Sequence, residues 1–569
     1  MCIFAAQKPV KKRGRAKKTT TDTRVYLDHA DELIYDQNGP RRDAQFVKGN
    51  VSFRHKGAHL TCDSAYFYQQ SNSFRAFGHV RMKQGDTLTL TSDYAYYDGN
   101  DEMAEARHNV VLTHRKTKLY CDSLNYDRLY SIGYFFEGGR MIDQDNHLVS
   151  DWGQYSTADK DAIFYYDVTL KNKKMTMTGD TLYYDTKTHV AHVTGPSTIV
   201  SSDKENTIVS ENSYYNTDTE QAELFGRSTV YNKDGKVITA DSLYHNSNTG
   251  ESEGILNVIY TDTLNKNIIT ADYFRYNENT GAGYATRNPV VRDYSQGDTL
   301  YVHSDSMRIE TFNIETDSVY RFVHAYPHVR AYRTDLQAVC DSMVMSSLDS
   351  CLVMYRDPVC WSDGRQLLGE QITVFMGDST IRFAHVERQA LSVELMFDNE
   401  HYNQVSSHEM KAWFDEEGKL KLNQAERNVL VIYYPIDDSD STLIGMNYTE
   451  TDTMRMYLSP QRTLDRIWMP KHKGVMYPLN QVPAGKELLP AFGWFDYMRP
   501  MSKDDIYVWI PKHEGTELKE LVRREPPKQN ILKPKATPVV QEQHDEAKGD
   551  DTSDDADAEN AEIEEGSGE

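Results

Sequence analysis

The stretch Ile-Thr-Ala-Asp-Ser-Leu-Tyr-His-Asn at 238–246 has close relatives about every 30 residues through most of the chain. The other copies begin at Leu60, Leu90, Leu119, Leu148, Met177, Ile208, Ile269, Val302 and Ala338, with a partial first copy at 30–36. A fixed period of this length predicts a repeat architecture, in which each unit buries its apolar face only against its neighbours.

Within the nine-residue motif, position one is apolar, position three is small, position four is acidic, and positions six and eight are apolar or aromatic. Because side chains alternate faces along a strand, positions one and three would lie opposite to six and eight. A β-bulge or corner at positions four and five would restore a common face, and the acid could accept hydrogen bonds from amides freed at the bend. This role is predicted for Asp63, Asp93, Asp122, Asp151, Asp180, Glu211, Asp241, Asp272, Asp305 and Asp341.

A ladder of metal-binding or catalytic carboxylates is the alternative interpretation of these acids. It is disfavoured, because they lack the glycine-rich nonapeptides of calcium-binding β-rolls and because catalysis needs a single site. His189 and His192 lie three residues apart, which on a strand places them on opposite faces and argues against a shared ion. The sequence therefore predicts no catalytic residue, no metal site and no cofactor.

The second half of each repeat is marked by Gly or Asn shortly before Val, as in Gly49-Asn50-Val51 and Asn257-Val258. Such turn residues introduce β-branched strands with alternating polarity. No stretch shows a sustained helical period with caps, so the body is predicted to be almost entirely β.

The length of 569 residues would divide an ordinary globular chain into several domains, whereas a repeat array adds units to one body. We therefore predict a basic arm or signal-peptide remnant at 1–23, regular repeats at 24–345 and degenerate repeats at 346–450. A segment rich in Pro and Trp follows at 451–522 and would cover the open end of the array, since a bare sheet edge recruits other strands. Residues 523–569 are predicted to be a disordered linker and acidic tail.

The formal net charge of −23 is shared between the body and this tail, which has thirteen acidic residues and one lysine beyond residue 540. A tail of this composition is expected to be disordered and solvating. An acidic body gives no support for binding to a phosphate backbone, and nucleic acid is excluded as a partner.

The six cysteines do not form an evident disulfide framework. Cys62 and Cys121 occupy the same motif position two units apart, which separates them by roughly 10 Å at the usual strand spacing, too far for a bridge. They are predicted to be small thiols in the core. Cys340 could pair locally with Cys351 or Cys360, and that alternative stays open.

The first seven residues, Met-Cys-Ile-Phe-Ala-Ala-Gln, are too short for a signal peptide but are similar to the end of one. Export is the favoured expectation, with a start assigned too far downstream. The alternative is a flexible basic arm on an intracellular protein.

The repeated motif resembles the OstA/LptA family of periplasmic lipopolysaccharide-transport proteins. The segments 238–241 and 269–272, both reading Ile-Thr-Ala-Asp, and Gly49-Asn50-Val51 carry the resemblance. It covers 24–345 clearly and reaches 450 weakly. It implies an all-β, elongated, V-shaped repeat jellyroll of about 10–13 units, located in the periplasm and bridging to the outer membrane of a Gram-negative bacterium. It implies no catalytic residues.

If two sheets face each other as in this family, the apolar motif positions converge on a groove that shelters the acyl chains of lipid A. The expected lining is Leu60, Leu90, Leu119, Leu124, Leu182, Ile208, Ile238, Leu243, Ile269 and Phe274. The resemblance further implies lipopolysaccharide or a related acylated glycolipid as ligand. LptC-like and LptD-like transport components would bind at the sheet edges, where self-association is also expected.

Two alternatives remain open. A closed β-solenoid with a packed interior would be a structural protein or an adhesin, and the aromatic residues at position eight favour it somewhat. A β-helical enzyme acting on polysaccharide would need acids clustered in one groove outside the repeat register, and the sequence has none. The 38 tyrosines are interpreted mainly as stacked ladders between repeats, with a sugar-binding surface as the alternative.

Overall fold

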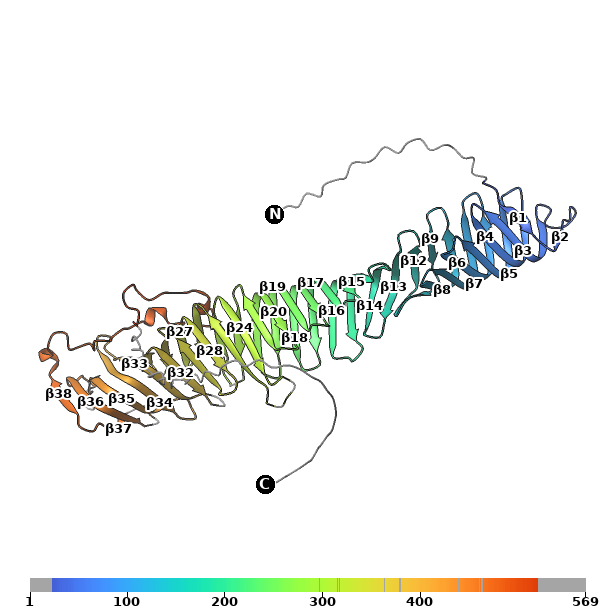
Figure 1. The fold of residues 1–569 in the computed structure, drawn as a ribbon. Helices are drawn as coiled ribbons and strands as arrows, with labels where there is room; N and C mark the ends of the chain where they lie inside the picture. The colour runs from blue at the N-terminus through green and yellow to red at the C-terminus, as the bar shows by residue number, and fades with distance from the viewer. Residues whose placement is uncertain are drawn as a thin grey trace, which may run out of the picture. The chain divides into compact units, whose positions relative to one another are not determined.

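The computed structural model describes residues 23–519, except residues 296, 315, 317, 363, 378–379, 438–440, 460 and 462–463. The arm predicted at 1–23 lies outside the described residues apart from Thr23, as do Cys2 and the tail predicted at 523–569. The described residues form 38 strands, joined in antiparallel pairs, and three short 3₁₀ helices, so the predicted all-β fold is confirmed (Figure 1).

The N-terminal strands are β1 (Tyr26–His29), β2 (Glu32–Ile34), β3 (Gln45–His55), β4 (Ala58–Tyr68), β5 (Ser73–Gln84), β6 (Leu88–Asp98), β7 (Met103–His114) and β8 (Thr117–Asp127). Short strands follow, β9 (Ile132–Phe135), β10 (Gly139–Asp143), β11 (Asn146–Ser150) and β12 (Trp152–Ser156). Long strands then return as β13 (Asp161–Lys171), β14 (Met175–Asp185), β15 (Val190–Ser201), β16 (Asn206–Asn216), β17 (Gln221–Asn232), β18 (Lys236–Asn246), β19 (Glu251–Asp262) and β20 (Asn267–Asn277).

A second run of short strands comprises β21 (Ala282–Thr286), β22 (Val290–Asp293), β23 (Leu300–His303), β24 (Ser306–Phe312), β25 (Tyr320–Tyr326), β26 (Val329–Arg333), β27 (Leu336–Cys340), β28 (Ser342–Ser346), β29 (Cys351–Tyr355), β30 (Val359–Ser362), β31 (Arg365–Leu368) and β32 (Gln371–Met376). The last strands are β33 (Ile381–Leu395), β34 (Tyr402–Phe414), β35 (Leu420–Tyr433), β36 (Met446–Leu458), β37 (Leu464–Trp468) and β38 (Lys473–Tyr477). The 3₁₀ helices are η1 (Leu479–Gln481), η2 (Asp496–Met498) and η3 (Asp505–Tyr507).

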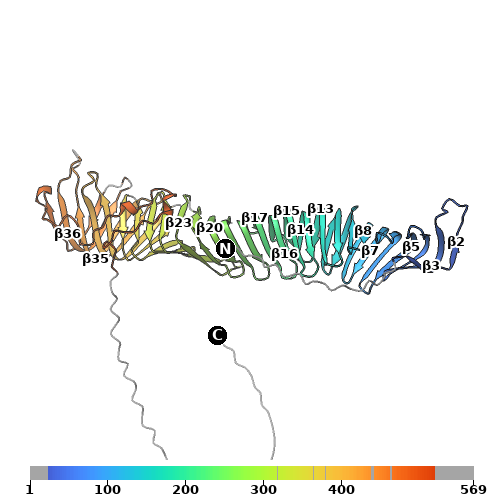
Figure 2. The same cartoon turned by 90° about the horizontal axis from the view of Figure 1, so that it is seen from above.

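The strands build two layers, which are easiest to follow where the strands are short. There β22, β23, β26, β27, β30 and β31 pair in one layer, and β21, β24, β25, β28, β29 and β32 pair in the other. Each long strand contributes one half to each layer. For example, β20 pairs with β22 through residues 267–270 and with β21 through residues 273–277. Figure 2 shows the long strands side by side along the array. We name the two layers layer one, which holds motif positions one to three, and layer two, which holds positions six to eight.

A β-bulge separates the two halves of the long strands. β3 pairs Lys48 with Ser64 and Val51 with Cys62, which leaves two residues, Gly49 and Asn50, opposite Asp63 alone. Both have left-handed backbones, with φ of 81° and 48°. The extra residue thus lies in the partner strand rather than at the acid, where the sequence placed it. The effect is as expected, because an inserted residue brings the apolar positions of both halves to a common side.

The motif acids lie beside these bulges, and several of them accept hydrogen bonds from side chains of the left-handed residues. The Oδ2 atoms of Asp63, Asp93 and Asp241 lie 2.8, 2.7 and 2.6 Å from His79 Nδ1, Asn109 Nδ2 and Asn257 Nδ2. A backbone amide is a donor at Asp122, 3.4 Å from the nitrogen of Asn109. The expected amide donors are therefore largely replaced by side chains of the bulge.

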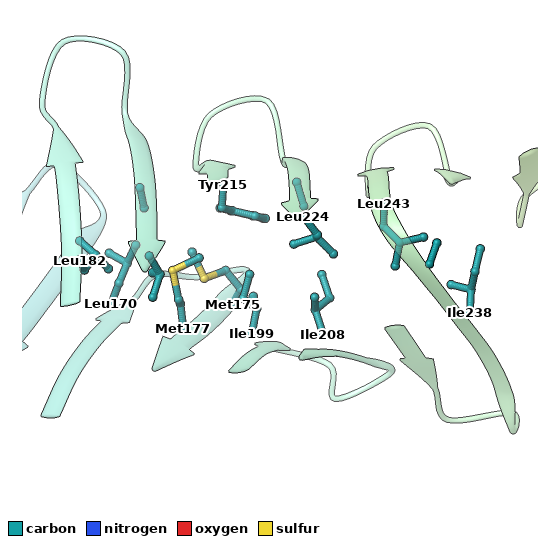
Figure 3. Packing of buried hydrophobic residues seen from close by; sticks show 14 of the residues in the cluster. Leu170, Met175, Met177, Leu182, Ile199, Ile208, Tyr215, Leu224, Ile238 and Leu243 are labelled. Atoms are coloured by element: carbon teal, nitrogen blue, oxygen red, sulfur yellow. The ribbon is translucent and has the colours of Figure 1, made fainter. Parts of the chain in front are cut away.

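The two layers face each other across an apolar interior. Figure 3 shows Tyr215, Leu224 and Leu243 of layer two meeting Ile199 and Ile208 of layer one between the sheets. The buried residues of both layers form one cluster that runs from Val25 to Leu420. Packing of this extent along an array replaces the single compact core of a globular domain.

Gly153 occupies motif position six, where most repeats have a larger apolar residue. A Cβ atom there would lie 2.6 Å from Cζ of Phe135 and 2.9 Å from Cδ1 of Phe164, both buried. We expect Gly153→Ala to destabilise the fold by about 1–3 kcal/mol through overpacking. At Gly254, also in a strand, the nearest atoms would lie 3.0–3.4 Å away. In chemical denaturation, Gly254→Ala should therefore cost less, and equal costs would contradict the explanation.

Residues 479–518, which we name the strap, follow the last strand and lie against the outer face of layer one. Buried glutamines on that face bind the strap's backbone. Gln366 donates to the carbonyl of Gly493 at 2.8 Å and accepts from the amide of Phe495 at 2.7 Å. Gln404 donates to the carbonyl of Glu487 at 2.9 Å and accepts from the amide of Leu489 at 2.8 Å.

The outer face beneath the strap is apolar. It forms a separate cluster with the strap, made of Val339, Val359, Trp361, Leu368, Leu391, Val393, Met396, Ile432, Tyr434, Met446, Leu489, Phe495 and Met498. At the free edge of β36, β37 and β38 pair with the two halves of that strand. The segment that was expected to cover the end of the array thus adds two edge strands and then lies along one face.

Candidate functional site

The structure places all ten predicted groove residues in the apolar cluster between the layers. Their exposed fractions lie between 0 and 8%, for Leu60, Leu90, Leu119, Leu124, Leu182, Ile208, Ile238, Leu243, Ile269 and Phe274. Over most of the array this space is filled by side chains. Phe53 and Phe74, for example, stack with ring centroids 4.2 Å apart.

A cavity of about 440 Å³ opens between the layers over residues 260–376. Layer one contributes Ile269, Val291 and Leu300 to its wall, and layer two contributes Ile309 and Val323. Smaller cavities of about 50 and 20 Å³ adjoin Ile238 with Phe274, and Leu60, respectively. The volume of the large cavity lies within the range of small-molecule sites. Its apolar wall suits hydrocarbon, and charged side chains such as Asp262, Lys266 and Arg333 line the rest.

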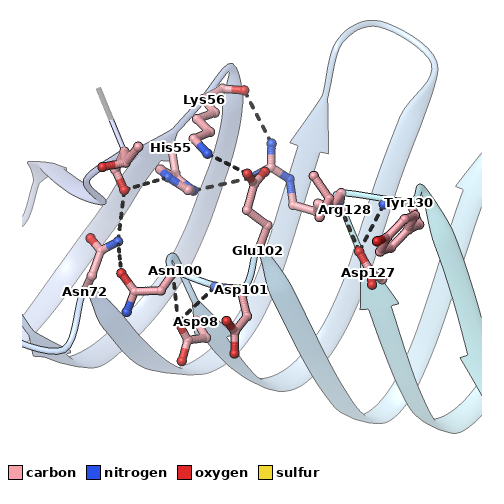
Figure 4. Close-up of polar contacts among 12 residues, drawn as sticks. His55, Lys56, Asn72, Asp98, Asn100, Asp101, Glu102, Asp127, Arg128 and Tyr130 are labelled. Atoms are coloured by element: carbon pink, nitrogen blue, oxygen red, sulfur yellow. Dashed lines mark hydrogen bonds and ion pairs between the residues drawn. The ribbon is translucent and has the colours of Figure 1, made fainter. Parts of the chain in front are cut away.

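The ends of the strands of the two layers approach each other along a line that we name the mouth. Near the N-terminus the mouth is bridged by side chains. His55 Nδ1 of layer one lies 2.7 Å from the hydroxyl of Tyr97 of layer two, and Arg128 donates to that same hydroxyl at 2.6 Å. Arg128 also donates to Gln84 at 3.2 Å. Figure 4 shows Lys56 and Glu102, which form an ion pair of 2.5 Å in the same group.

Further bridges follow along the mouth. His114 Nδ1 lies 2.9 Å from the hydroxyl of Tyr155. Tyr184 donates to Asp143 at 3.1 Å and accepts from Asn146 at 2.9 Å, and Asn146 also donates to Thr217 at 3.0 Å. In each pair one residue ends a strand of layer one and the other belongs to layer two, so the bridges hold the layers together.

Burial changes the protonation equilibria of these bridges. It lowers the pKa of His55, where the nearby charges of Arg128 and Lys56 act in the same direction. It also lowers the pKa of His114 and raises that of Tyr97. Both imidazoles are therefore neutral at neutral pH and serve as hydrogen-bond partners rather than as cations.

Folding stability is expected to fall as the pH drops from about 7.5 to about 5.5. A histidine whose pKa is lowered in the folded state binds a proton more readily in the unfolded state. As the pH falls below the usual histidine pKa of 6.5, protonation therefore favours unfolding. Thermal unfolding at several pH values checks this. The double variant His55→Gln, His114→Gln should show a weaker dependence, and an unchanged dependence would contradict the role of these two residues.

Tyrosines at motif position seven form ladders with aromatic side chains of the neighbouring strands on the outer face of layer two. Tyr183, His192 and Tyr214 stack with centroid distances of 5.6 and 3.9 Å, and Tyr214 meets Phe225 at 6.1 Å. Ring faces are occupied by neighbouring rings in this ladder, which fits the structural interpretation of the tyrosines better than a sugar-binding surface.

The described part of the chain has neither a disulfide nor a group of side chains that could hold a metal ion. Cys62, Cys121, Cys340, Cys351 and Cys360 are all free thiols, so the local bridge left open for Cys340 is not formed. Burial raises the pKa of Cys62 to about 12, which makes its thiol unreactive. Within the same residues, no three His, Cys, Asp or Glu side chains form a group that could hold a metal ion, and no helix is long and apolar enough to cross a membrane.

The mouth residues were missed by sequence reasoning, although a signal was present. Position eight is tyrosine in several repeats, including Tyr97, Tyr155 and Tyr184. A buried tyrosine hydroxyl needs a hydrogen-bond partner, so this repetition could have indicated a polar rim beside the apolar interior. These tyrosines were instead expected to form ladders, with a sugar-binding surface as the alternative.

Two facing β layers around an apolar interior define an antiparallel β-repeat protein with a candidate site for hydrocarbon. Residues 22–180 match the family model of OstA-like proteins, which confirms the predicted resemblance over that segment. The chain is also similar to the crystal structure of LptH, with 18% sequence identity. LptH is described as the LptA-homologous periplasmic component of the lipopolysaccharide transport device of Pseudomonas aeruginosa. That similarity covers 19% of this chain and 81% of LptH, with a TM-score of 0.18. No curated protein matches the chain.

Proposed function

We propose that this protein is a non-enzymatic carrier that holds an acylated glycolipid, such as lipopolysaccharide, by its acyl chains between the two layers. The observation that carries the proposal is the cavity of about 440 Å³, which both layers line with apolar side chains in the interior and with charged ones where it opens at the mouth. Each methylene group that leaves water for such a space gains about 0.8 kcal/mol. The resemblance to the OstA/LptA family supports this ligand class and a periplasmic location in a Gram-negative bacterium.

The ten predicted groove residues take part in this proposal in different ways. Ile269 lines the large cavity, whereas residues such as Leu119 and Leu182 are packed against the opposite layer. A lipid would reach the packed positions only where the layers separate. Carriage along the array therefore requires local opening, in which acyl chains replace contacts between the layers.

The terminal edges of the array are the proposed sites for LptC-like and LptD-like partners and for self-association. β1 and β2 form the N-terminal edge, and β37 and β38 form the C-terminal one. Large apolar side chains are exposed there, including Leu33 and Ile34 at one edge and Trp468 and Val475 at the other. Edge strands present unpaired backbone groups to which a partner strand can bond.

Native mass spectrometry of protein purified from its own host, without detergent, tests the function. We expect adducts with the mass of an acylated glycolipid. The variant Val323→Trp, which fills the cavity, should lose them, and the control Val209→Trp on the exposed outer face should keep them. Protein that is consistently empty would contradict the proposal.

A second candidate is a structural role with a permanently closed interior. The tight packing of the N-terminal half favours it, as in the stacked pair Phe53 and Phe74. The same measurement separates the two, because a closed structural protein would carry no lipid in either variant or in the natural chain.

A further inference from the structure

The mouth differs along the array in a way that bears on where a lipid can pass. Several side-chain bridges join the layers from His55 to Thr217. The large cavity lies beyond them, over residues 260–376, and the layers are joined beside it by the ion pair of Asp262 with Arg321. The bridges consist of buried polar groups that satisfy one another. Separating them would leave donors and acceptors unpaired until water entered, which costs about 1–3 kcal/mol for each group.

The cavity lies at the mouth itself, where both layers supply exposed apolar side chains. Leu264, in the turn between β19 and β20 of layer one, is 72% exposed and lines the cavity. Val319, which precedes β25 of layer two, is 42% exposed and lines it from the other side. Asp262, which is 1% exposed, and Arg321 form an ion pair of 3.4 Å across the layers next to the opening.

We infer that the opening at residues 260–376 is the port through which acyl chains enter the space between the layers, while the bridges between His55 and Thr217 keep the mouth shut. The inference rests on the proposed function and adds the place of access. Acyl chains reach the N-terminal half from inside, along the array. The exposed Lys266 and the partly buried Arg321 line the opening and leave the polar headgroup in water at the port.

Two exposed leucines at the mouth provide a matched test. Leu264 lies at the port, and Leu129, which is 64% exposed, follows Arg128 in the bridged part. A photoreactive p-benzoylphenylalanine replaces each residue in turn in the full chain, and the variants are irradiated with vesicles that contain lipid A. We expect at least tenfold more lipid cross-linked at position 264 than at 129, with equal melting temperatures of the two proteins.

A second variant tests directly whether the bridges keep the mouth shut. Tyr97→Phe removes the hydroxyl that both His55 and Arg128 contact, so cross-linking from position 129 should rise in that background. Equal cross-linking at 129 and 264 in the natural background would overturn the inference, as would a lack of effect of Tyr97→Phe. If native mass spectrometry finds bound lipid but position 264 captures none, the port fails and the proposed function stands. If no lipid is found by either method, both fail.

Discussion

Leu243→Asp is expected to melt the middle of the array while its ends stay folded. Leu243 is buried between the layers, and its Cδ2 atom would lie 3.4 Å from a Cβ atom at Gly254 on the neighbouring strand. An aspartate there would bury a charge without a partner. Leaving a buried charge unpaired by removing its partner destabilises proteins by about 3–5 kcal/mol, and we expect a similar cost here. Repeat arrays lose structure locally because each unit depends on its neighbours.

Hydrogen exchange followed by mass spectrometry measures this effect segment by segment. Amides of β17 to β20 should lose protection, and those of β4 to β6 and β34 to β35 should keep it. Val209→Asp is the control, because Val209 lies on the outer face and is exposed. If Leu243→Asp were as stable as this control, the interior would have to be wet, and the packed arrangement of the two layers would be wrong.

Removing the strap is the second change with a large expected effect. A chain that ends at residue 478 would expose the apolar outer face of layer one, including Trp361, Val359 and Ile432. Each such side chain loses about 1.5–3 kcal/mol when it returns to water. Gln366 and Gln404 would also lose their backbone partners in the strap. We expect self-association and a lower melting temperature.

Light scattering coupled to size exclusion gives the oligomeric state of the shortened chain. A chain that ends at residue 519 keeps the strap and lacks the linker and the acidic tail, so it separates their contribution from that of the strap. The longer form should behave like the full protein. If the form ending at 478 also stayed monodisperse and equally stable, the strap would contribute little to covering layer one.

The repeat itself could be predicted in detail from the sequence. The shared burial of positions one, three, six and eight follows from the motif once a bulge is assumed, as Leu60, Cys62, Ala65 and Phe67 illustrate. The strand that carries the extra residue was assigned wrongly, because the acid stands out in the sequence. The left-handed pair opposite the acid differs in sequence between repeats, and examples are Gly49-Asn50, Gly78-His79 and Leu256-Asn257.

The strap and the bridged mouth could not be predicted from the repeat. Gln337, Gln366 and Gln404 have no common spacing, and their partners lie far along the chain, such as Arg499 for Gln337 at 2.8 Å. The bridges join strand ends of different units, and whether those ends meet depends on how closely the layers approach. That distance is set by the volumes of all the side chains between them, which no single motif encodes.

The order in which strands pair has a consequence for how the chain assembles during synthesis. From β13 to β20 each strand bonds to the next one made, so the stack can lengthen as the polypeptide emerges, with short loops and little delay. The contact between Gln366 and Gly493 spans 127 positions and must wait until nearly the whole chain exists. Docking of the strap is thus the step that covers the apolar outer face of layer one, which until then leaves the chain prone to aggregate.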